Sequence, residues 1–363
     1  MLKAKKGGRA DFGKTVWCGC FPLCAALDRT RCWKPFIPMQ NTSHPISNQH
    51  TASTGPLFLA VVGPTASGKT DLALDLADRL GADILCVDAI QVYRGLDVGS
   101  AKPTAQQQAQ VRHHGIDLIS PMENFNAARY AEAVEPVLVQ AAADNRPLVL
   151  CGGTGLYYRS LLEGFFDAPD SDPALRNAIQ QRLQRDGAAA LHGELLAADP
   201  DTADGIHPND GRRIARALEL IQLTGGPVSE LRARQRRKPW SDRTVFMGIL
   251  RERDELDARV IQRTRWMYDN GLVDETRQLL EMGCDERYTA LQALGYKECM
   301  MYLQNKIGFD ESIEMTIHGT RRYTKRQMTW FRGQTETHWL EWRQGEPIEE
   351  KRNQCLKLWN NRC

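Results

Sequence analysis

The sequence predicts an α/β protein in which a doubly wound parallel sheet carries a helical insertion domain. Short, uninterrupted apolar runs at 57–62, 84–87, 148–151 and 245–250 are typical of strands buried on both faces. Helical patterns alternate with the first three runs, as expected when crossover helices join parallel strands. The segment 168–237 has helix-forming sequence and no convincing strand, so it predicts an insertion attached to the sheet.

The turn after the first strand has the sequence of a phosphate-binding loop, or P-loop. Residues 63–70 fit the pattern G-x-x-x-x-G-K-[ST] without a mismatch, and a helix pattern follows at 71–80. The glycines allow the backbone to curl so that several N–H groups point inward, and the helix N-terminus adds its positive end. Lys69 supplies a positive charge, and the Thr70 hydroxyl can bind Mg²⁺. A diphosphate fits this loop, whose expected ligand-binding residues are Gly63, Pro64, Thr65, Ala66, Ser67, Gly68, Lys69 and Thr70.

The loop alone does not identify the phosphate ligand. A nucleoside triphosphatase normally adds a strand that ends in Asp, which binds magnesium and water. The run 148–151 is instead followed by Gly-Gly-Thr at 152–154, which weakens that interpretation. Asp88 directly follows the run 84–87, at the carboxyl edge where open α/β sheets bind ligands. It could accept a proton from an attacking amine or hydroxyl, cap a helix or bind magnesium, and the spacing leaves these roles open.

Basic side chains gather locally in a chain whose formal net charge is only +2. Arginine and lysine dominate residues 232–238, and a second group decorates the expected helix at 321–332. Such clusters suit a phosphate backbone, although charge runs are more often solvated faces. The adjacent His113 and His114 cannot share a helix face, and no acid or cysteine ligand completes a metal site nearby, so we expect the pair to have a structural or loop role.

The first 55 residues are expected to form an extension and linker outside the fold. Their basic and mildly apolar stretches faintly resemble a signal peptide, but no clear cleavage site follows, and Met39 is an alternative start. No apolar run approaches the roughly 18 residues of a membrane span. The ten cysteines form no disulfide framework, and Cys86 and Cys151 lie in apolar runs. Buried thiols are typical of a reducing compartment, so we expect a cytoplasmic protein.

Six motifs together resemble one family. They are GPTASGKT at 63–70, DAIQVYRGLDVGSAKPT at 88–104, VLCGGTGLYYRSLLEG at 149–164, HPNDGRRIARALEL at 207–220, ALGYKE at 293–298 and TRRYTKRQMTWFRGQ at 320–334. In this order they resemble the bacterial tRNA dimethylallyltransferases, over residues 57–340. The last two motifs are far more specific than the P-loop.

The resemblance implies a magnesium-dependent transfer of a dimethylallyl group from dimethylallyl diphosphate. The acceptor would be N6 of the adenine at position 37, just 3′ of the tRNA anticodon, in tRNAs that read codons beginning with U. The adenine would be flipped out of the anticodon loop to reach the diphosphate. We expect a monomer with a P-loop core at 56–167 and 238–345, a tRNA-contacting insertion at 168–237, and a tail at 346–363.

The resemblance also assigns roles to individual residues. It places the diphosphate on 65–70 with Lys69, makes Asp88 the general base, and puts Thr154 beside the leaving-group oxygen or the acceptor base. One departure is Ala89, where most relatives have Ser, so a second hydroxyl near the acceptor is missing. The residues expected to contact tRNA are Asp88, Ala89, Ile90, Gln91, Thr154, Arg176, Arg212, Arg213, Ile214, Ala215, Arg216, Gln292, Ala293, Leu294, Gly295, Tyr296 and Lys297.

Three other functions share parts of this pattern. A P-loop small-molecule kinase would use the same loop and a second-strand acid. A transferase that prenylates free AMP or ATP would also need both, but the basic segments argue against that acceptor. A non-enzymatic RNA-binding protein would not need the intact loop at 63–70.

Overall fold

A computed structural model describes residues 57–165, 168–169, 171–234, 238, 240–333 and 336–361. The expected N-terminal extension with Met39 lies outside the described residues, as do Arg236 and Arg237 of the basic cluster. All described residues belong to one compact unit that spans 53–363.

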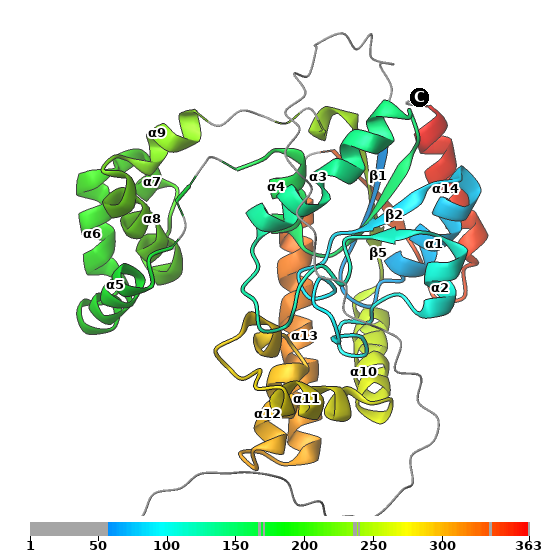
Figure 1. Cartoon of the computed structure of the whole chain (residues 1–363). Coiled ribbons are helices and arrows are strands. Elements are labelled where there is room, and N and C mark those ends of the chain that lie inside the picture. Colours follow the sequence, from blue (N-terminus) through cyan, green and yellow to red (C-terminus); the bar gives the residue numbers. More distant parts are fainter. Residues whose placement is uncertain are drawn as a thin grey trace, which may run out of the picture. The chain divides into compact units, whose positions relative to one another are not determined.

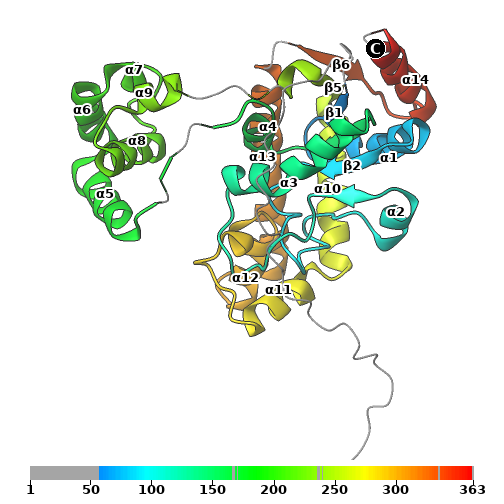
Figure 2. The ribbon, with the colours of Figure 1, turned by 45° about the horizontal axis from the view of Figure 1, so that its top comes forward.

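A six-stranded parallel sheet organises the fold, with the strand order β3-β2-β4-β1-β5-β6 (Figures 1 and 2). The central strand β1 lies between β4 and β5, so the turn that follows it opens at the middle of the carboxyl edge. The strands are β1 (Phe58–Val62), β2 (Asp83–Cys86), β3 (His113–His114), β4 (Leu148–Gly152), β5 (Thr244–Leu250) and β6 (Thr337–Glu341).

Helices cover both faces of the sheet, which confirms the doubly wound prediction. Side chains of β1 alternate between two apolar clusters, because successive residues of a strand point to opposite faces. Phe58 and Val62 pack with α3, α4 and α13, whereas Leu59 and Val61 pack with α1 and α14. The helices of this core are α1 (Lys69–Leu80), α2 (Ala105–Gln110), α3 (Ala127–Ala143), α4 (Gly155–Leu162), α10 (Arg253–Asp269), α11 (Leu272–Glu281), α12 (Tyr296–Leu303), α13 (Phe309–Arg332) and α14 (Ile348–Asn360).

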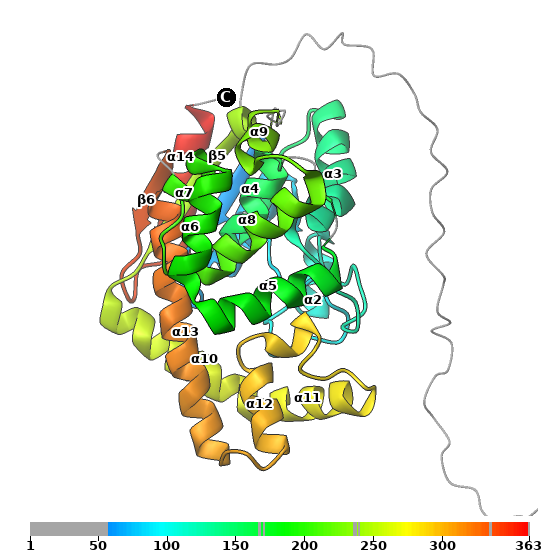
Figure 3. The same ribbon diagram turned by 90° about the vertical axis from the view of Figure 1, so that its left-hand side faces the viewer.

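The helical insertion has a hydrophobic core of its own. Its first helix begins where Asp172 accepts a hydrogen bond from the Ala174 N–H (2.8 Å) and Pro173 takes the first helical position. Ile179, Leu191 and Ile214 are buried in this core. The insertion contains α5 (Pro173–Asp186), α6 (Ala188–Ala198), α7 (Pro200–Asp204), α8 (Gly211–Thr224) and α9 (Val228–Ala233), labelled in Figure 3. The helical character predicted for 168–237 is therefore confirmed for the residues described.

The expectation of a tail at 346–363 is wrong for most of that segment. Residues 348–360 form α14, which packs against α1 and buries Cys355 and Trp359. The Arg352 guanidinium also donates to both carboxylate oxygens of Asp75 on α1, at 3.0 and 3.1 Å. The strand β6 before this helix was not predicted, because its sequence alternates weakly and it lies at the sheet edge.

The histidine pair forms the short edge strand β3. His114 Nε2 lies 2.9 Å from the Asp83 carboxylate, and His113 Nδ1 lies 2.7 Å from the Val111 carbonyl oxygen. These bonds serve the fold, in agreement with the structural role expected from sequence. None of the helices that the structure describes is long and apolar enough to cross a bilayer.

We predict that Arg352→Ala lowers the free energy of unfolding by about 1.5–3 kcal/mol, because hydrogen bonds to a charged group contribute about that much. Urea unfolding of the purified protein measures this change. Lys357→Ala on the exposed side of α14 is the matched control and should leave the midpoint nearly unchanged. Equal effects of the two substitutions would show that the Arg352–Asp75 contact does not hold α14 in place.

Candidate active site

The loop after β1 has the geometry of an anion cradle. Gly68 has φ +93°, a conformation that side chains rarely adopt, and a Cβ there would lie 3.3 Å from Arg251 Nη2 and the Trp342 ring. No side chain caps the N-terminus of α1, so the first N–H groups of that helix are available to a ligand. The buried Ser67 Oγ has no hydrogen-bond partner among the described residues. An orphaned buried hydroxyl in this loop is what a phosphate oxygen would satisfy.

Two arginines donate hydrogen bonds to carbonyl groups of the P-loop, and the sequence analysis predicted neither of them. The Arg251 Nε donates to the Ser67 carbonyl oxygen at 2.9 Å, and the Arg259 Nε donates to the Ala66 carbonyl oxygen at 2.7 Å. Because these bonds hold the carbonyl groups outward, they leave the loop N–H groups to face the ligand. The arginines are 184 and 193 residues from their partners in sequence, so no local pattern could have revealed them.

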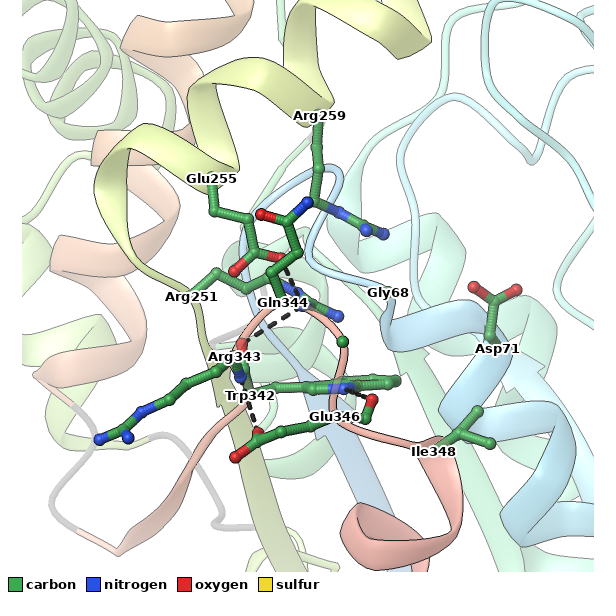
Figure 4. Close-up of a pocket in the computed structure, with 11 residues that line it drawn as sticks. Gly68, Asp71, Arg251, Glu255, Arg259, Trp342, Arg343, Gln344, Glu346 and Ile348 are labelled. Atoms are coloured by element: carbon green, nitrogen blue, oxygen red, sulfur yellow. Dashed lines mark hydrogen bonds and ion pairs between the residues drawn. The ribbon is translucent and has the colours of Figure 1, made fainter.

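A small pocket lies beside the cradle (Figure 4). Its volume is about 300 Å³, and Gly68, Arg259 and Trp342 are among its lining residues. The Arg251 guanidinium stacks 4.4 Å from the centroid of the Trp342 ring and also donates to Glu255 Oε1 at 2.5 Å. These contacts fix the wall of the pocket that adjoins the P-loop.

Lys69 and Arg263 bring positive charge to the cradle. The Lys69 Nζ donates to the Pro64 carbonyl oxygen at 3.3 Å, and burial lowers the pKa of this amine from its ordinary value. Burial also lowers the pKa of Arg263, whose Nε has no hydrogen-bond partner among the residues described. The carboxylate of Asp88 opposes both shifts in pKa. A bound diphosphate would compensate these two partly desolvated cations.

Asp88 lies at the same carboxyl edge with one oxygen fixed. Its Oδ1 accepts the backbone N–H groups of Ile90 at 2.9 Å and Gln91 at 3.3 Å. Nothing in the described part of the chain bonds to Oδ2. The carboxyl group is half-buried, so this second oxygen can meet a substrate proton. Of the roles left open by the sequence, the helix cap is wrong, because Asp88 caps a turn and the next helix begins only at Ala105. The free oxygen is compatible with the role of a base.

The Gly-Gly-Thr turn after β4 joins Asp88 to the cradle. Thr154 Oγ1 accepts the Ala89 N–H at 3.1 Å, next to the proposed base. The side chain of Gln327 on α13 connects this turn to the P-loop: its Oε1 accepts the Thr65 N–H at 2.9 Å, and its Nε2 donates to the Gly153 carbonyl oxygen at 3.0 Å. A Cβ at Gly153 would lie 2.1 Å from that Nε2, so only glycine permits the contact.

Tyr323, one turn before Gln327 on α13, also reaches this site. Burial and, to a smaller extent, the Asp88 carboxylate raise the pKa of its phenol to about 12. The phenol therefore stays protonated near neutral pH and can act only as a neutral hydrogen-bonding group. The motif at 320–334 contained both residues, but the sequence analysis assigned no individual role to either of them.

The residues expected to contact tRNA differ in their exposure. Ile214 and Tyr296 are fully buried, in the insertion core and the main core respectively, so their side chains serve packing in this structure. Arg213 pairs with Asp210 at 3.4 Å on the surface. Arg216 binds the buried carboxylate of Glu219 at 2.8 Å, which anchors it to its own helix. The exposed members of the set are Arg176, Arg212, Arg213, Gln292 and Lys297, for which contact with RNA stays a prediction.

Comparison with known proteins identifies the family. A family model described as IPP transferase matches residues 91–334. The chain belongs to the IPP transferase family. It is 42% identical over 287 residues to tRNA dimethylallyltransferase 1 of Trichlorobacter lovleyi, covering 78% of this chain and 93% of that relative.

Solved structures agree with the fold. The tRNA isopentenylpyrophosphate transferase of Bacillus halodurans matches with a TM-score of 0.62 at 35% identity, covering 84% of this chain and 97% of that one. A eukaryotic dimethylallyltransferase acting on tRNA matches with a TM-score of 0.70 at 24% identity, covering 85% and 80% of the two chains. The second likeness shows the fold alone. Together they confirm the predicted P-loop α/β architecture.

We predict that the affinity for inorganic diphosphate falls as the pH rises through the lowered pKa of Lys69. The protonated amine attracts the anion, so the affinity is fully present below that pKa and is lost above it. Isothermal titration between about pH 7 and pH 10 measures this dependence. Lys69→Met removes the titrating amine and should flatten the decline. If the affinity for diphosphate still falls with rising pH in Lys69→Met, a group other than Lys69 causes the pH dependence.

Proposed function

We propose that this member of the IPP transferase family transfers a dimethylallyl group from dimethylallyl diphosphate to N6 of adenine 37 in tRNA. The observation that carries the proposal is the convergence, at one sheet edge, of an anion cradle and a carboxylate with a free oxygen. Gln327 and Thr154 connect the two through direct hydrogen bonds. The relatives named above are tRNA prenyltransferases by name, which supports the same acceptor class.

The chemistry follows from the charges of the site. The bond between the allylic carbon and the diphosphate oxygen breaks, and the diphosphate leaves with the electron pair. A new bond forms between that carbon and N6, and the N6 proton passes to Asp88. Because the allylic cation is stable, negative charge grows early on the leaving group. The loop N–H groups, Lys69 and Arg263 stabilise that charge where it develops.

A magnesium ion belongs to the proposal. Mg²⁺ is commonly held by one or two protein oxygens together with substrate phosphates. The Thr70 hydroxyl, at the end of the P-loop, fits that pattern. In the described ranges no group of three or more His, Cys, Asp or Glu side chains could hold a metal without substrate. When bound, the ion would supply further charge stabilisation to the departing diphosphate.

The Thr154 hydroxyl lies against the Tyr323 phenol and can also serve the substrate. Its oxygen already accepts the Ala89 N–H, so its own hydrogen can point to the leaving-group oxygen or to the adenine. The backbone N–H of Ala89 is thereby held in place without the Ser hydroxyl usual at this position. We propose that this contact replaces part of the orienting role of that hydroxyl.

A basic surface on α13 suits the RNA backbone. His318, Arg321, Arg322 and Lys325 are spaced i, i+3, i+4 and i+7, so they follow one face of the helix and line a pocket of about 350 Å³. Arg321 pairs with Asp257 on α10 at 3.3 Å. The exposed Arg322 and Lys325 have no acidic partner in the described chain. Unneutralised cations in a nearly neutral protein support binding of a phosphate backbone.

We extend the proposal to a monomer that acts in the cytoplasm. The support for the compartment is the state of the thiols: the five cysteines that the structure describes are free and buried. Thiols of this kind persist in a reducing compartment.

The direct test is to locate the label after incubating labelled dimethylallyl diphosphate with unmodified tRNA, with AMP, or with neither. We expect label on N6 of adenine 37 and none on AMP. Label on AMP would favour the free-nucleotide acceptor. Turnover of ATP without prenyl transfer would favour a small-molecule kinase. If the label remains in unreacted dimethylallyl diphosphate under every condition, that result would contradict prenyl transfer.

We also predict that Arg322→Gln and Lys325→Gln each reduce the salt dependence of tRNA binding. Each phosphate contact removed should lower the slope of log K against log[salt] by roughly 0.7–0.9. Filter binding at several salt concentrations measures the slope. Arg79→Gln, an exposed cation on α1 at the opposite face of the sheet, is the control. A slope unchanged in both α13 variants would remove this surface from the RNA path.

A further inference from the structure

A carboxylate from α11 binds three consecutive backbone amides of the loop that follows Asp88. The Glu275 Oε2 accepts the N–H groups of Asp97 at 2.9 Å and Val98 at 2.8 Å, and its Oε1 accepts that of Gly99 at 3.4 Å. The Tyr296 hydroxyl on α12 donates to the same Oε1. Successive N–H groups that converge in this way form an anion-binding nest. Here the anion comes from the chain itself, 176–178 residues away.

The loop approaches the two helices too closely for a side chain at position 99. A Cβ at Gly99 would lie 2.6 Å from the Tyr296 ring and 2.7 Å from Leu272 Cδ1. Tyr296 is fully buried, and burial raises the pKa of its phenol well above the ordinary value. The phenol therefore remains a donor to Glu275 at any pH near neutral. The contact is a packed, part-buried junction rather than a surface ion pair.

Hydrogen bonds continue from this junction to the proposed base. The Gln91 side-chain amide donates to the carbonyl oxygens of Ser100 at 3.3 Å and Ala101 at 3.1 Å, directly after the residues that Glu275 holds. The backbone N–H of Gln91 in turn donates to Asp88 Oδ1. A further hydrogen bond within the loop comes from the buried Lys102, whose Nζ donates to the Tyr93 carbonyl oxygen at 2.9 Å. Hydrogen bonds within residues 91–102 therefore hold the loop together, and Glu275 fixes its backbone at 97–99.

We propose that Glu275 is a positioning residue for the transfer step, which sets the loop carrying Asp88 and Gln91 and ties it to α12. The inference rests on the proposed function, because it assigns Asp88 the role of base. The tie to α12 matters because Gln292 and Lys297, two exposed residues of the expected tRNA surface, flank the start of that helix. A displacement of the loop by about 1 Å from the productive geometry can cost on the order of 10²-fold in rate.

The test compares Glu275→Gln with a matched control. Asp274→Asn removes the same charge from the adjacent position, where the side chain is exposed and paired with Arg277. Each variant is measured for single-turnover transfer to tRNA at saturating substrates, for diphosphate affinity and for thermal midpoint. We expect Glu275→Gln to slow transfer about 10- to 100-fold with diphosphate affinity within about twofold of wild type. Asp274→Asn should leave all three near wild type.

A double-mutant cycle separates positioning from general stability. If Glu275 acts through Asp88, then adding Asp88→Asn to Glu275→Gln should cost much less than the product of the two separate losses. A fully multiplicative loss, or a Glu275→Gln rate within about twofold of wild type, would overturn the proposal. Should Glu275→Gln not fold, Tyr296→Phe removes one hydrogen bond to Glu275 and leaves the three amide contacts. Tyr296→Phe is combined with Asp88→Asn in the same kind of cycle, and its loss of transfer rate should be smaller than that expected for Glu275→Gln.

Amide hydrogen exchange tests the junction without any substrate. The N–H groups of Asp97, Val98 and Gly99 should exchange faster in Glu275→Gln than in wild type or in Asp274→Asn. Unchanged exchange would show that Glu275 does not hold the loop and would overturn the inference. Absence of transfer by the wild-type protein would instead contradict the proposed function, so the two failures can be told apart.

Discussion

The site depends on one buried amide side chain. Gln327 accepts the Thr65 N–H of the P-loop and donates to the Gly153 carbonyl oxygen of the turn after β4. In a parallel sheet these two turns emerge from neighbouring strands at the same edge, where pairing fixes the strand ends at Val62 and Gly152 but leaves open the separation of the turns beyond them. The two hydrogen bonds from one side chain set it. Thr154 follows Gly153 in the chain, and its Oγ1 accepts the N–H of Ala89. The position of the turn therefore also restrains the residue next to the proposed base.

The helix that supplies this amide has two distinct faces. Gln327 and Tyr323 point to the active site, whereas Arg322 and Lys325 belong to the basic surface that follows the opposite side of α13. One rigid element therefore relates the diphosphate cradle to an RNA-binding surface. Glu275 makes a comparable link on the other side of Asp88, from α11 and α12 to the loop. Both links use side chains far in sequence from the groups that they hold.

The sequence predicted those parts of the site that are local in the chain. The P-loop, Asp88 and Thr154 each follow a buried strand, so the strand pattern alone brings them to one edge. Arg251 and Arg259, which donate to the P-loop, were missed because their partners are backbone carbonyl groups, which have no sequence signature. Tyr296 was assigned to RNA through the resemblance, whereas packing places it in the core. The edge strands β3 and β6 were missed because short or half-exposed strands carry weak patterns.

In the proposed reaction, the cradle and Asp88 act on one displacement, the cradle on the leaving diphosphate and Asp88 on the N6 proton. Single-turnover transfer from dimethylallyl diphosphate to tRNA by Asp88→Asn tests it most directly, with donor binding measured on the same variant. The amide keeps the turn contacts to Ile90 and Gln91 but cannot take the N6 proton. We expect transfer to slow by about 10²–10⁴-fold while donor affinity stays near wild type. A transfer rate close to that of the wild-type protein would contradict it.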